Sequence, residues 1–266
     1  MMKRLSILLA LLLPAAAWAQ TTTELGIRAS VEGNYKITKG LHLYAEEEVR
    51  TKATSLDNFR TTLGLTWKPV KGLKFGVGYT LINPYSSSNG AFKNPRHRVF
   101  ADVTGSLNAG DFQFSLKERV QLTHRTGEFN VYQTTPNAVA LKSKLTVKYK
   151  GFYSAEPYLS FELRTALNDP WGTADTSNDA VWNNKGTKQY YPYTPAGYTH
   201  VYNNRYRGEA GVAISLGKHH ELKPFVLLDY NNDYEIDING EGTHIFSAAY
   251  VNSFQVSLGI GYVFSF

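Results

Sequence analysis

The chain has 266 residues, of which 28 are Lys or Arg and 22 are Asp or Glu, so its formal net charge is +6 at pH 7. It contains no cysteine, which excludes a disulfide framework, a thiolate nucleophile and a thiolate metal site. The mildly basic charge is by itself no evidence for nucleic-acid binding. After the amino-terminal segment, no apolar run approaches the roughly 18 residues that a membrane-spanning helix needs.

The amino-terminal segment has the pattern of a secretory signal peptide. Lys3 and Arg4 form a short positive region, residues 5–13 form an apolar run, and Ala17-Trp18-Ala19 is a small-x-small cleavage site. The run is too short for a membrane-spanning helix. We therefore predict a signal peptide over residues 1–19 and one domain over residues 20–266.

From residue 25 onward the chain reads as a series of strands, each with one apolar and one polar face. The pattern is clear at the start, where Leu25, Ile27 and Val31 alternate with Arg28 and Glu32. Side chains alternate between the two faces of a strand, so every second residue shares an environment. Strands with this pattern are expected at about 25–37, 41–52, 59–67, 73–81, 96–108, 111–124, 139–150, 159–167, 203–216, 222–238 and 245–266.

Most of these segments exceed the roughly 9–11 residues with which a tilted strand crosses a bilayer. A soluble β-sandwich would have shorter strands and a mixed outer face. The pattern therefore predicts an all-β fold, a transmembrane antiparallel β-barrel of about 10–12 strands. Eleven strands are visible, but bacterial single-chain barrels usually have an even number, so twelve is preferred.

The connections between these strands alternate between short and long. Tight turns are expected at 38–40, 69–72, 108–110, around Gly151 and at 217–220, and longer loops at 53–58, 84–95, 125–138 and 168–202. Short periplasmic turns and long outer loops are the expected asymmetry. Asn239-Gly240 is a hairpin signal, which predicts that the last two strands form a ribbon projecting beyond the outer leaflet.

The polar faces carry charges of both signs, with a surplus of cations. One interpretation is a ladder of ion pairs that fills a narrow barrel, because charges removed from water must be paired. The other is an anion-favouring lumen, because cations lining a channel select counter-ions. The charged ladder predicted for the lumen consists of Glu46, Glu48, Arg50, Arg60, Arg98, Lys117, Arg119, Glu162, Arg164, Arg205, Arg207 and Glu209.

Two carboxylates, Glu47 and Glu118, fall on the apolar face, where a carboxylate is costly unless it lies near an interface. A local bulge or a shifted register there would move them and alter the distribution of charge inside.

The segment 168–202 is rich in aromatic residues that are candidates for binding sugar rings or a partner. These candidates are Trp171, Trp182, Tyr190, Tyr191 and Tyr193. The alternatives are that the loop folds into the barrel mouth as a plug, or that its aromatics join the girdle at the membrane interface.

Acidic and amide side chains occupy every second position from Asp229 to Glu241. Hard cations prefer clustered carboxylates, but the spacing does not fit an EF-hand loop. A solvated or arginine-paired face is the preferred interpretation, and no metal or cofactor is predicted.

Histidines occur at positions 42, 97, 124, 200, 219, 220 and 244 without a matching serine. Nucleophile, base and orienting group must converge in a hydrolase, and no such set is visible. No catalytic residue is predicted, and a lipid hydrolase ranks third among the functions considered.

The last thirteen residues, 254–266, form a strand with a continuous apolar face that ends on Phe266. This strand resembles the terminal strand that the bacterial barrel-assembly machinery reads in outer-membrane proteins. The resemblance implies a bacterial outer-membrane location, with outer-membrane lipid, lipopolysaccharide and the barrel-assembly machinery as partners. An anionic solute is a further candidate partner, and no nucleic acid is expected.

Several short motifs together resemble one protein family. They are Glu46-Glu47-Glu48-Val49-Arg50, Phe59-Arg60, Gly78-Tyr79, Arg96-His97-Arg98, Lys117-Glu118-Arg119, Asn204-Arg205-Tyr206-Arg207 and Tyr262-Val263-Phe264. They resemble the small bacterial outer-membrane barrels catalogued as domain of unknown function 2490, over nearly the whole mature chain. That family has no established activity to carry over.

At the level of architecture, the chain also resembles twelve-stranded porins for acidic oligosaccharides, which line a narrow pore with arginine. Fold alone does not set function. The first functional hypothesis is therefore a structural or narrow transport barrel of unassigned substrate, and the alternative is an anion-selective porin for acidic oligosaccharides.

Overall fold

The computed structural model of the chain describes residues 22–52, 55–177, 181–182 and 189–266. The predicted signal peptide, residues 1–19, lies outside the described residues. In the part that is described, no helix has the length and apolarity needed to cross a membrane.

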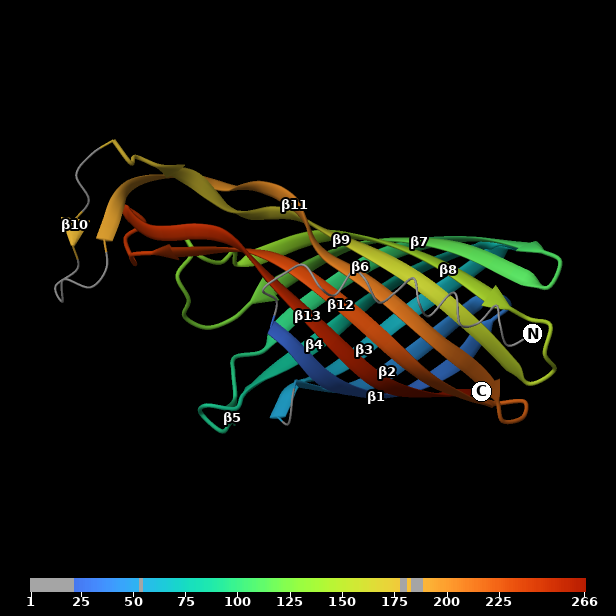
Figure 1. The fold of residues 1–266 in the computed structure, drawn as a ribbon. Helices are drawn as coiled ribbons and strands as arrows, with labels where there is room; N and C mark the ends of the chain where they lie inside the picture. The colour runs from blue at the N-terminus through green and yellow to red at the C-terminus, as the bar shows by residue number, and fades with distance from the viewer. Residues whose placement is uncertain (1–21, 53–54, 178–180, 183–188) are drawn as a thin grey trace, which may run out of the picture.

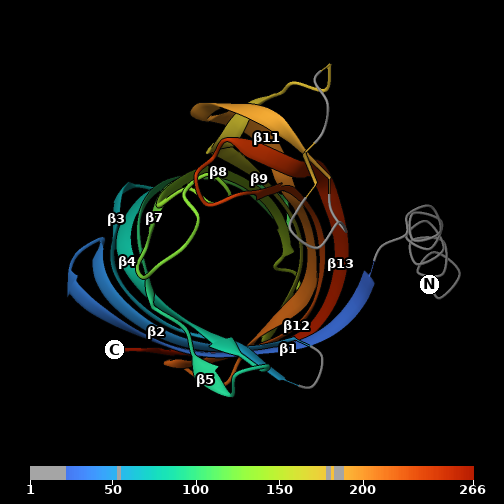
Figure 2. The same cartoon turned by 90° about the vertical axis from the view of Figure 1, so that its left-hand side faces the viewer.

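The fold is a closed β-barrel (Figures 1 and 2), which confirms the predicted all-β barrel. Its wall contains eleven strands in chain order around the barrel. They are β1 (Thr22–Thr38), β2 (Leu41–Lys52), β3 (Ser55–Val70), β4 (Leu73–Ser86), β6 (Arg96–Ala109), β7 (Phe112–Arg125), β8 (Asn137–Tyr149), β9 (Ala155–Ala174), β11 (Gln189–Ser215), β12 (His220–Ile238) and β13 (His244–Ser265). Two short strands, β5 (Ala91–Phe92) and β10 (Val181–Trp182), lie in the connections.

The barrel closes through a parallel pair, which corrects the preference for twelve strands. Neighbours along the chain pair antiparallel, whereas β1 pairs with β13 in parallel, from Thr22 opposite Ser253 to Asn34 opposite Ser265. Strand direction alternates around the wall, so an odd number brings the first and last strands together with the same direction. The visible count of eleven was therefore the real one.

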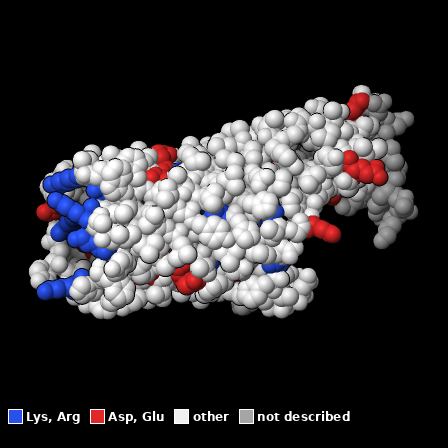
Figure 3. All heavy atoms as spheres, turned by 180° about the vertical axis from the view of Figure 1, so that it is seen from behind, with Lys and Arg blue, Asp and Glu red and all other residues white. Residues whose placement is uncertain are grey.

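The apolar face of each strand points out of the barrel and the polar face points in. On β1, Leu25 is 61% exposed and Arg28 only 6% exposed. In the view of Figure 3 the outer wall carries few charged side chains, and Lys and Arg gather at the end with the short turns. The barrel thus exposes the apolar faces of its strands and encloses the polar ones, whereas a soluble sheet buries its apolar face.

Glu47 and Glu118 stay on the outer face without a bulge. The pairing of β2 with β3, and of β7 with its neighbours, runs without a register shift at these positions. Each carboxylate accepts a hydrogen bond from a hydroxyl on the next strand, Glu47 from Thr61 at 2.9 Å and Glu118 from Ser143 at 2.6 Å. A cross-strand hydroxyl therefore partly satisfies each outward carboxylate.

Four strands, β9, β11, β12 and β13, continue beyond the barrel as a projection (Figure 1). A small core of Tyr193, Ile236, Ile238 and Ile245 holds its tip together, and β11 pairs with β13 there at Tyr191 opposite Ile245. The predicted loop 168–202 is therefore largely strand. Its prolines and glycines are tolerated because β9 and β11 pair with several register shifts, for example between Pro195 and Gly197.

The turn between β12 and β13 lies at the tip, as the Asn239-Gly240 signal predicted. The left-handed backbone belongs to Gly242, at φ 73°, rather than to Gly240. The Asn239 side-chain oxygen accepts hydrogen bonds from the Thr243 and His244 amides at 2.9 and 3.1 Å, which closes a longer turn than the dipeptide predicts.

The connection between β7 and β8, residues 126–136, folds in over the mouth at the projecting end (Figure 2). We call it the mouth loop. The Asn130 amide nitrogen donates to the carbonyl oxygens of Ile238 and Asn239 at 3.2 and 3.1 Å. The mouth loop is thereby attached to the turn between β12 and β13 at the tip of the projection.

Candidate functional site

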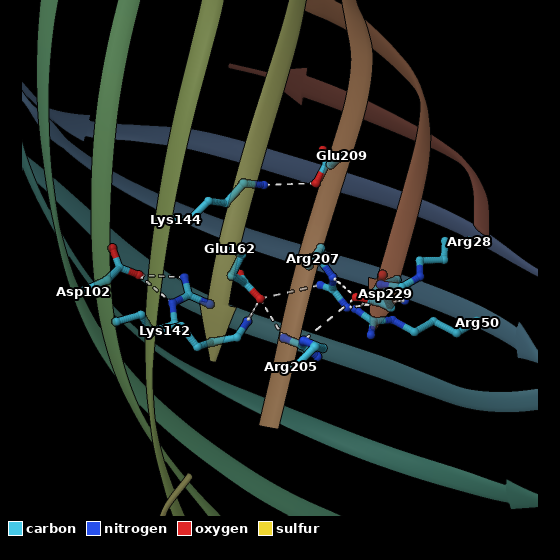
Figure 4. A network of polar contacts seen from close by, with 12 residues as sticks. Arg28, Arg50, Asp102, Lys142, Lys144, Glu162, Arg205, Arg207, Glu209 and Asp229 are labelled. Atoms are coloured by element: carbon cyan, nitrogen blue, oxygen red, sulfur yellow. Dashed lines mark hydrogen bonds and ion pairs between the residues drawn. The ribbon is translucent and has the colours of Figure 1, made fainter. Parts of the chain in front are cut away.

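Two buried carboxylates organise the charges inside the barrel (Figure 4). Asp229, 2% exposed, accepts from Arg28 at 2.7 Å and from Arg207 at 2.6 Å. Glu162 pairs with Arg205 at 2.6 Å and with Lys142 at 3.1 Å. Buried carboxylates of this kind are stable only when their charge and lone pairs are satisfied.

Arg205 and Arg207 also reach both carboxylates, because Arg205 lies 4.0 Å from Asp229 and Arg207 lies 3.9 Å from Glu162. The set Arg28, Lys142, Glu162, Arg205, Arg207 and Asp229 therefore forms one connected network across β1, β8, β9, β11 and β12. We call it the ion-pair girdle. It contains four cations and two carboxylates, so it is itself positively charged.

Other residues of the predicted ladder form smaller groups. Asp102 binds Arg119 at 2.6 Å and Lys117 at 3.2 Å, and the Arg119 guanidinium also lies 3.9 Å from the centre of the Phe100 ring. Arg50 pairs with Glu48 at 2.7 Å on the same strand.

The Glu209 carboxylate forms an ion pair with Lys144 at 3.0 Å and accepts a hydrogen bond from the Tyr158 hydroxyl at 2.8 Å. The ladder residues Glu46, Arg60, Arg98 and Arg164 have no ion-pair partner within 4 Å among the described residues.

Two of the cavities inside the described part of the barrel share no lining residue. The outer cavity, at the projecting end, has a volume of about 610 Å³, and the inner cavity, toward the turn end, about 550 Å³. Arg205, Arg207 and Lys142 of the girdle form part of the outer cavity's wall.

The outer cavity is strongly basic. Nine of its lining residues are cationic and three are acidic. The cations are Arg50, Arg60, Arg96, Arg98, Arg125, Lys142, Arg164, Arg205 and Arg207, and the acids are Asp169, Asp233 and Glu235. The inner cavity is more balanced, since Glu32, Glu46 and Asp102 lie there together with lysines and Arg119.

Four buried donors at the outer cavity lack a hydrogen-bond partner among the described residues. They are Arg50 Nε, Arg125 Nε, Arg205 Nε and Thr135 Oγ1. Thr135 is only 2% exposed and comes from the mouth loop. A buried donor without an acceptor costs about 1–3 kcal/mol, so such groups rarely gather in one place without a reason. All four can donate, and each is covered by neighbouring side chains, so the charge of the cavity's lining is the stronger indication of an anion.

Sequence reasoning missed part of this cavity. Arg96 and Arg125 could have been found from the sequence. Arg96 lies on the same strand face as Arg98, and Arg125 lies on the same face as Thr123 and Gln121. The residues from the mouth loop have none, since Gln133, Thr134 and Thr135 reach the cavity only through the fold of that loop.

The aromatic candidates of segment 168–202 lie in different places. The Trp171 ring packs 4.5 Å from the His200 ring, within a cluster that also includes Tyr202, Tyr234 and Tyr250. Tyr193 is buried in the core at the tip with Tyr191 against it, so Tyr193 offers little surface to a ligand. Tyr190 packs on Phe246 at 5.9 Å, and the side chain of Trp182 lies outside the described part of the structure.

The His200 cluster adjoins the outer cavity, which Tyr202 and Tyr234 line. The Tyr202 hydroxyl donates to Asp169 at 2.8 Å, and the Tyr250 hydroxyl and His200 Nε2 are 3.0 Å apart. Burial lowers the pKa of the His200 imidazole, while the Asp169 carboxylate opposes that shift. His200 is therefore largely neutral at pH 7.

The acidic strand β12 contributes to both the girdle and the cavity. Asp229 is paired with arginines, and Asp233 accepts from the Asn204 amide at 3.2 Å.

Among the described residues, no histidine hydrogen-bonds to a serine hydroxyl, the contact that a serine hydrolase requires. The basic lining of the outer cavity is suited to binding anions.

The comparisons with known proteins give one match. A family model described as a protein of unknown function, DUF2490, matches residues 26–182, a span that begins in β1 and ends in β10. No curated protein matches the chain.

Proposed function

Because the chain belongs to the DUF2490 family of proteins of unknown function, we propose its function from its own geometry: an outer-membrane β-barrel that binds small anions in its outer cavity and passes them through a narrow, ion-paired interior. The proposed role is non-catalytic. Outer-membrane lipid and lipopolysaccharide would surround the wall, and the barrel-assembly machinery would recognise the terminal strand that ends on Phe266.

The outer wall supports the membrane location. Its exposed side chains are apolar along each strand, and aromatic residues occur at both ends of the wall. Trp67, Phe112 and Tyr149 lie toward the turn end, and Tyr79, Tyr206 and Tyr230 toward the projecting end. Two aromatic girdles flanking an apolar band are the expected surface of an outer-membrane barrel.

One observation carries the anion assignment: nine cationic and three acidic residues line the outer cavity. Cations that line a low-dielectric cavity attract counter-ions and repel other cations. The girdle below this cavity narrows the route without reversing the sign of its charge.

We predict that the purified barrel in a planar bilayer gives a small unitary current whose reversal potential in a KCl gradient favours chloride over potassium. The combined substitution Arg60→Gln, Arg98→Gln and Arg164→Gln should lower the chloride preference by about fivefold or more, because each exposed charge at close range contributes about 1 kcal/mol. These three arginines leave no carboxylate unpaired when they are replaced.

Lys93→Gln is the matched control, since Lys93 lies at the same end but outside the outer cavity. It should leave the reversal potential unchanged. Absence of any unitary current, or a preference for potassium, would contradict the proposed function.

An acidic oligosaccharide is the second candidate solute, because the outer cavity places Tyr202 and Tyr234 beside the arginines. Aromatic faces pack against sugar rings while guanidinium groups pair with carboxylates. We predict that trigalacturonate interrupts the current and that uncharged maltotriose does not. No effect from either sugar would restrict the solute to small anions, and equal effects of the two would show that sugar entry does not depend on the arginines.

A further inference from the structure

A second basic depression lies at the turn end, away from the outer cavity. It has a volume of about 640 Å³, and its lining brings together the turns after β1 and β3 with the facing parts of β6 and β7. Its polar lining side chains are those of Lys39, Lys68, Lys71, Lys74, Thr104, Ser106, Gln113 and Ser115. All of them can donate hydrogen bonds, and no Asp or Glu is among the described residues of its lining.

The four lysines differ from two paired lysines at the same end. Lys148 pairs with Glu156 at 2.8 Å and Lys223 with Glu221 at 2.7 Å. Lys39, Lys68, Lys71 and Lys74 have no carboxylate within 4 Å among the residues that the structure describes. Thr104 Oγ1, also in the depression, is buried and has no hydrogen-bond partner there.

The backbone beneath these lysines is fixed by hydrogen bonds between neighbouring turns and strands. The Lys68 amide donates to the Gly40 carbonyl at 2.8 Å, and the Ser106 amide donates to the Gly72 carbonyl at 2.7 Å. Gly40 and Gly72 have φ of 83° and 86°, a conformation that glycine adopts without strain. The ammonium groups are therefore presented from an ordered rim, although their own stems are flexible.

The depression belongs to the barrel interior and its exit. Thr104, Ser106 and Ser115 alternate with the outward residues Val103, Leu107 and Phe114, so they face inward. Lys68 and Lys74 also line the inner cavity, which connects the two spaces. A ligand here comes from solution, because the donors do not face the lipid side.

We propose that this lysine rim, defined as Lys39, Lys68, Lys71 and Lys74 with Thr104, is a second anion site that binds a compact multivalent oxyanion of the phosphate type. Lysine acts as a mobile point charge with three donors, so a group of lysines suits an oxyanion of small size and high charge. The site does not require the barrel to conduct, so it stands independently of the proposed function.

The test is calorimetric titration of inorganic pyrophosphate into the full chain in zwitterionic nanodiscs. The background carries Arg60→Gln, Arg98→Gln and Arg164→Gln, so that binding in the outer cavity is reduced. Adding Lys68→Gln, Lys71→Gln and Lys74→Gln should weaken pyrophosphate binding by about tenfold or more, since several charges near a multivalent anion are lost. Higher salt should weaken the original binding, because exposed charges are screened.

Lys150→Gln with Lys218→Gln is the matched control, because both lysines lie in exposed turns at the same end but outside the depression. This pair should leave the affinity unchanged, and replacing the three rim lysines by arginine should retain binding. Equal losses in the control and the rim variant, or no pyrophosphate binding in the background protein, would overturn the site. A barrel that binds pyrophosphate at the rim but carries no current would refute the proposed conduction and leave this inference intact.

Discussion

Replacing Asp229 with asparagine should lower the free energy of unfolding of the barrel by about 3–5 kcal/mol, the usual cost of leaving buried charges without their partner. Asp229 is 2% exposed and lies close to three guanidinium groups, those of Arg28, Arg205 and Arg207. Asparagine has nearly the same shape, so the loss comes from the charge. The three arginines would then face one another with Glu162 as the remaining carboxylate of the girdle.

The effect should be large because Asp229 joins strands that are not neighbours. Arg28 lies on β1 and Asp229 on β12, with β13 between them in the wall. The ion pair therefore supports the parallel closure of the barrel. Parallel pairing is slightly less stable per residue than antiparallel pairing, so the closure depends more on such contacts.

Urea unfolding of the folded protein in detergent micelles, followed by circular dichroism, measures this loss. Glu156→Gln is the control, because it removes a partner of Lys148 in a half-exposed pair and should cost less than about 1 kcal/mol. Asp229→Asn combined with Arg207→Gln should recover part of the loss, since one uncompensated cation is removed. Equal stability of Asp229→Asn and Glu156→Gln would show that the girdle does not support the barrel.

The strands and their faces could be predicted because alternation is a local property. Leu25 and Arg28 reveal their environments through their immediate neighbours, whatever the rest of the chain does. The closure could not be predicted in this way. Whether β1 meets β13 in parallel depends on the number of strands in the whole wall, and one strand more or less changes only that single pairing.

The pairing of charges was hidden for a related reason. The sequence suggests that Arg28 and Asp229 face inward, but 201 positions separate them and the tilt of the strands decides that they meet. The same geometry leaves Arg60, Arg98 and Arg164 without carboxylates within 4 Å in the described structure, although Glu48 lies opposite Arg60 on the next strand and Glu162 lies two residues before Arg164 on β9. The surplus of cations can be counted from the composition, but the place where they gather, the outer cavity, follows only from the fold.

The projection was misread as a loop because its sequence carries loop signals. Pro192, Pro195 and Gly197 all lie in β11, where irregular pairing accommodates them. The small core around Tyr193 and Ile236 supplies the burial that a free loop would lack. The segment that lies over the mouth of the barrel is therefore the mouth loop, residues 126–136, and not residues 168–202.

Releasing the mouth loop should raise the conductance of the barrel several-fold. The Asn130 side chain makes three hydrogen bonds: its amide nitrogen donates to Ile238 and Asn239, and its oxygen accepts from the Tyr132 amide at 2.9 Å. The two bonds to the projection contribute about 1 kcal/mol each, so Asn130→Ala should shift the loop toward its released state by about 2 kcal/mol, roughly thirtyfold. Thr135 would leave the cavity wall with the loop.

Single-channel recording of Asn130→Ala should show more frequent transitions to a higher conductance than the wild-type protein shows. Asn89→Ala is the control, because Asn89 lies in another connection at the same end and has only an exposed side-chain contact with Ser88. Limited digestion with chymotrypsin gives a second readout that needs no current, since Phe129 and Tyr132 lie in the mouth loop and should be cut faster once Asn130 is lost.

Unchanged cleavage together with unchanged current in Asn130→Ala would mean that the loop is held by its other contacts. Among the described residues these contacts include the Tyr132 ring packed on the core at the tip and the Thr126 hydroxyl bonded to the Pro95 carbonyl. They also include the Gln133 amide to the Ile238 carbonyl at 3.4 Å and the Tyr198 hydroxyl to the Val131 carbonyl at 3.1 Å. Each of these hydrogen bonds is single and contributes less than the two bonds of Asn130 to the projection, whereas the packed Tyr132 ring also holds the loop on the tip. We therefore expect Asn130 to be one of the points at which the projection holds the mouth loop over the basic outer cavity.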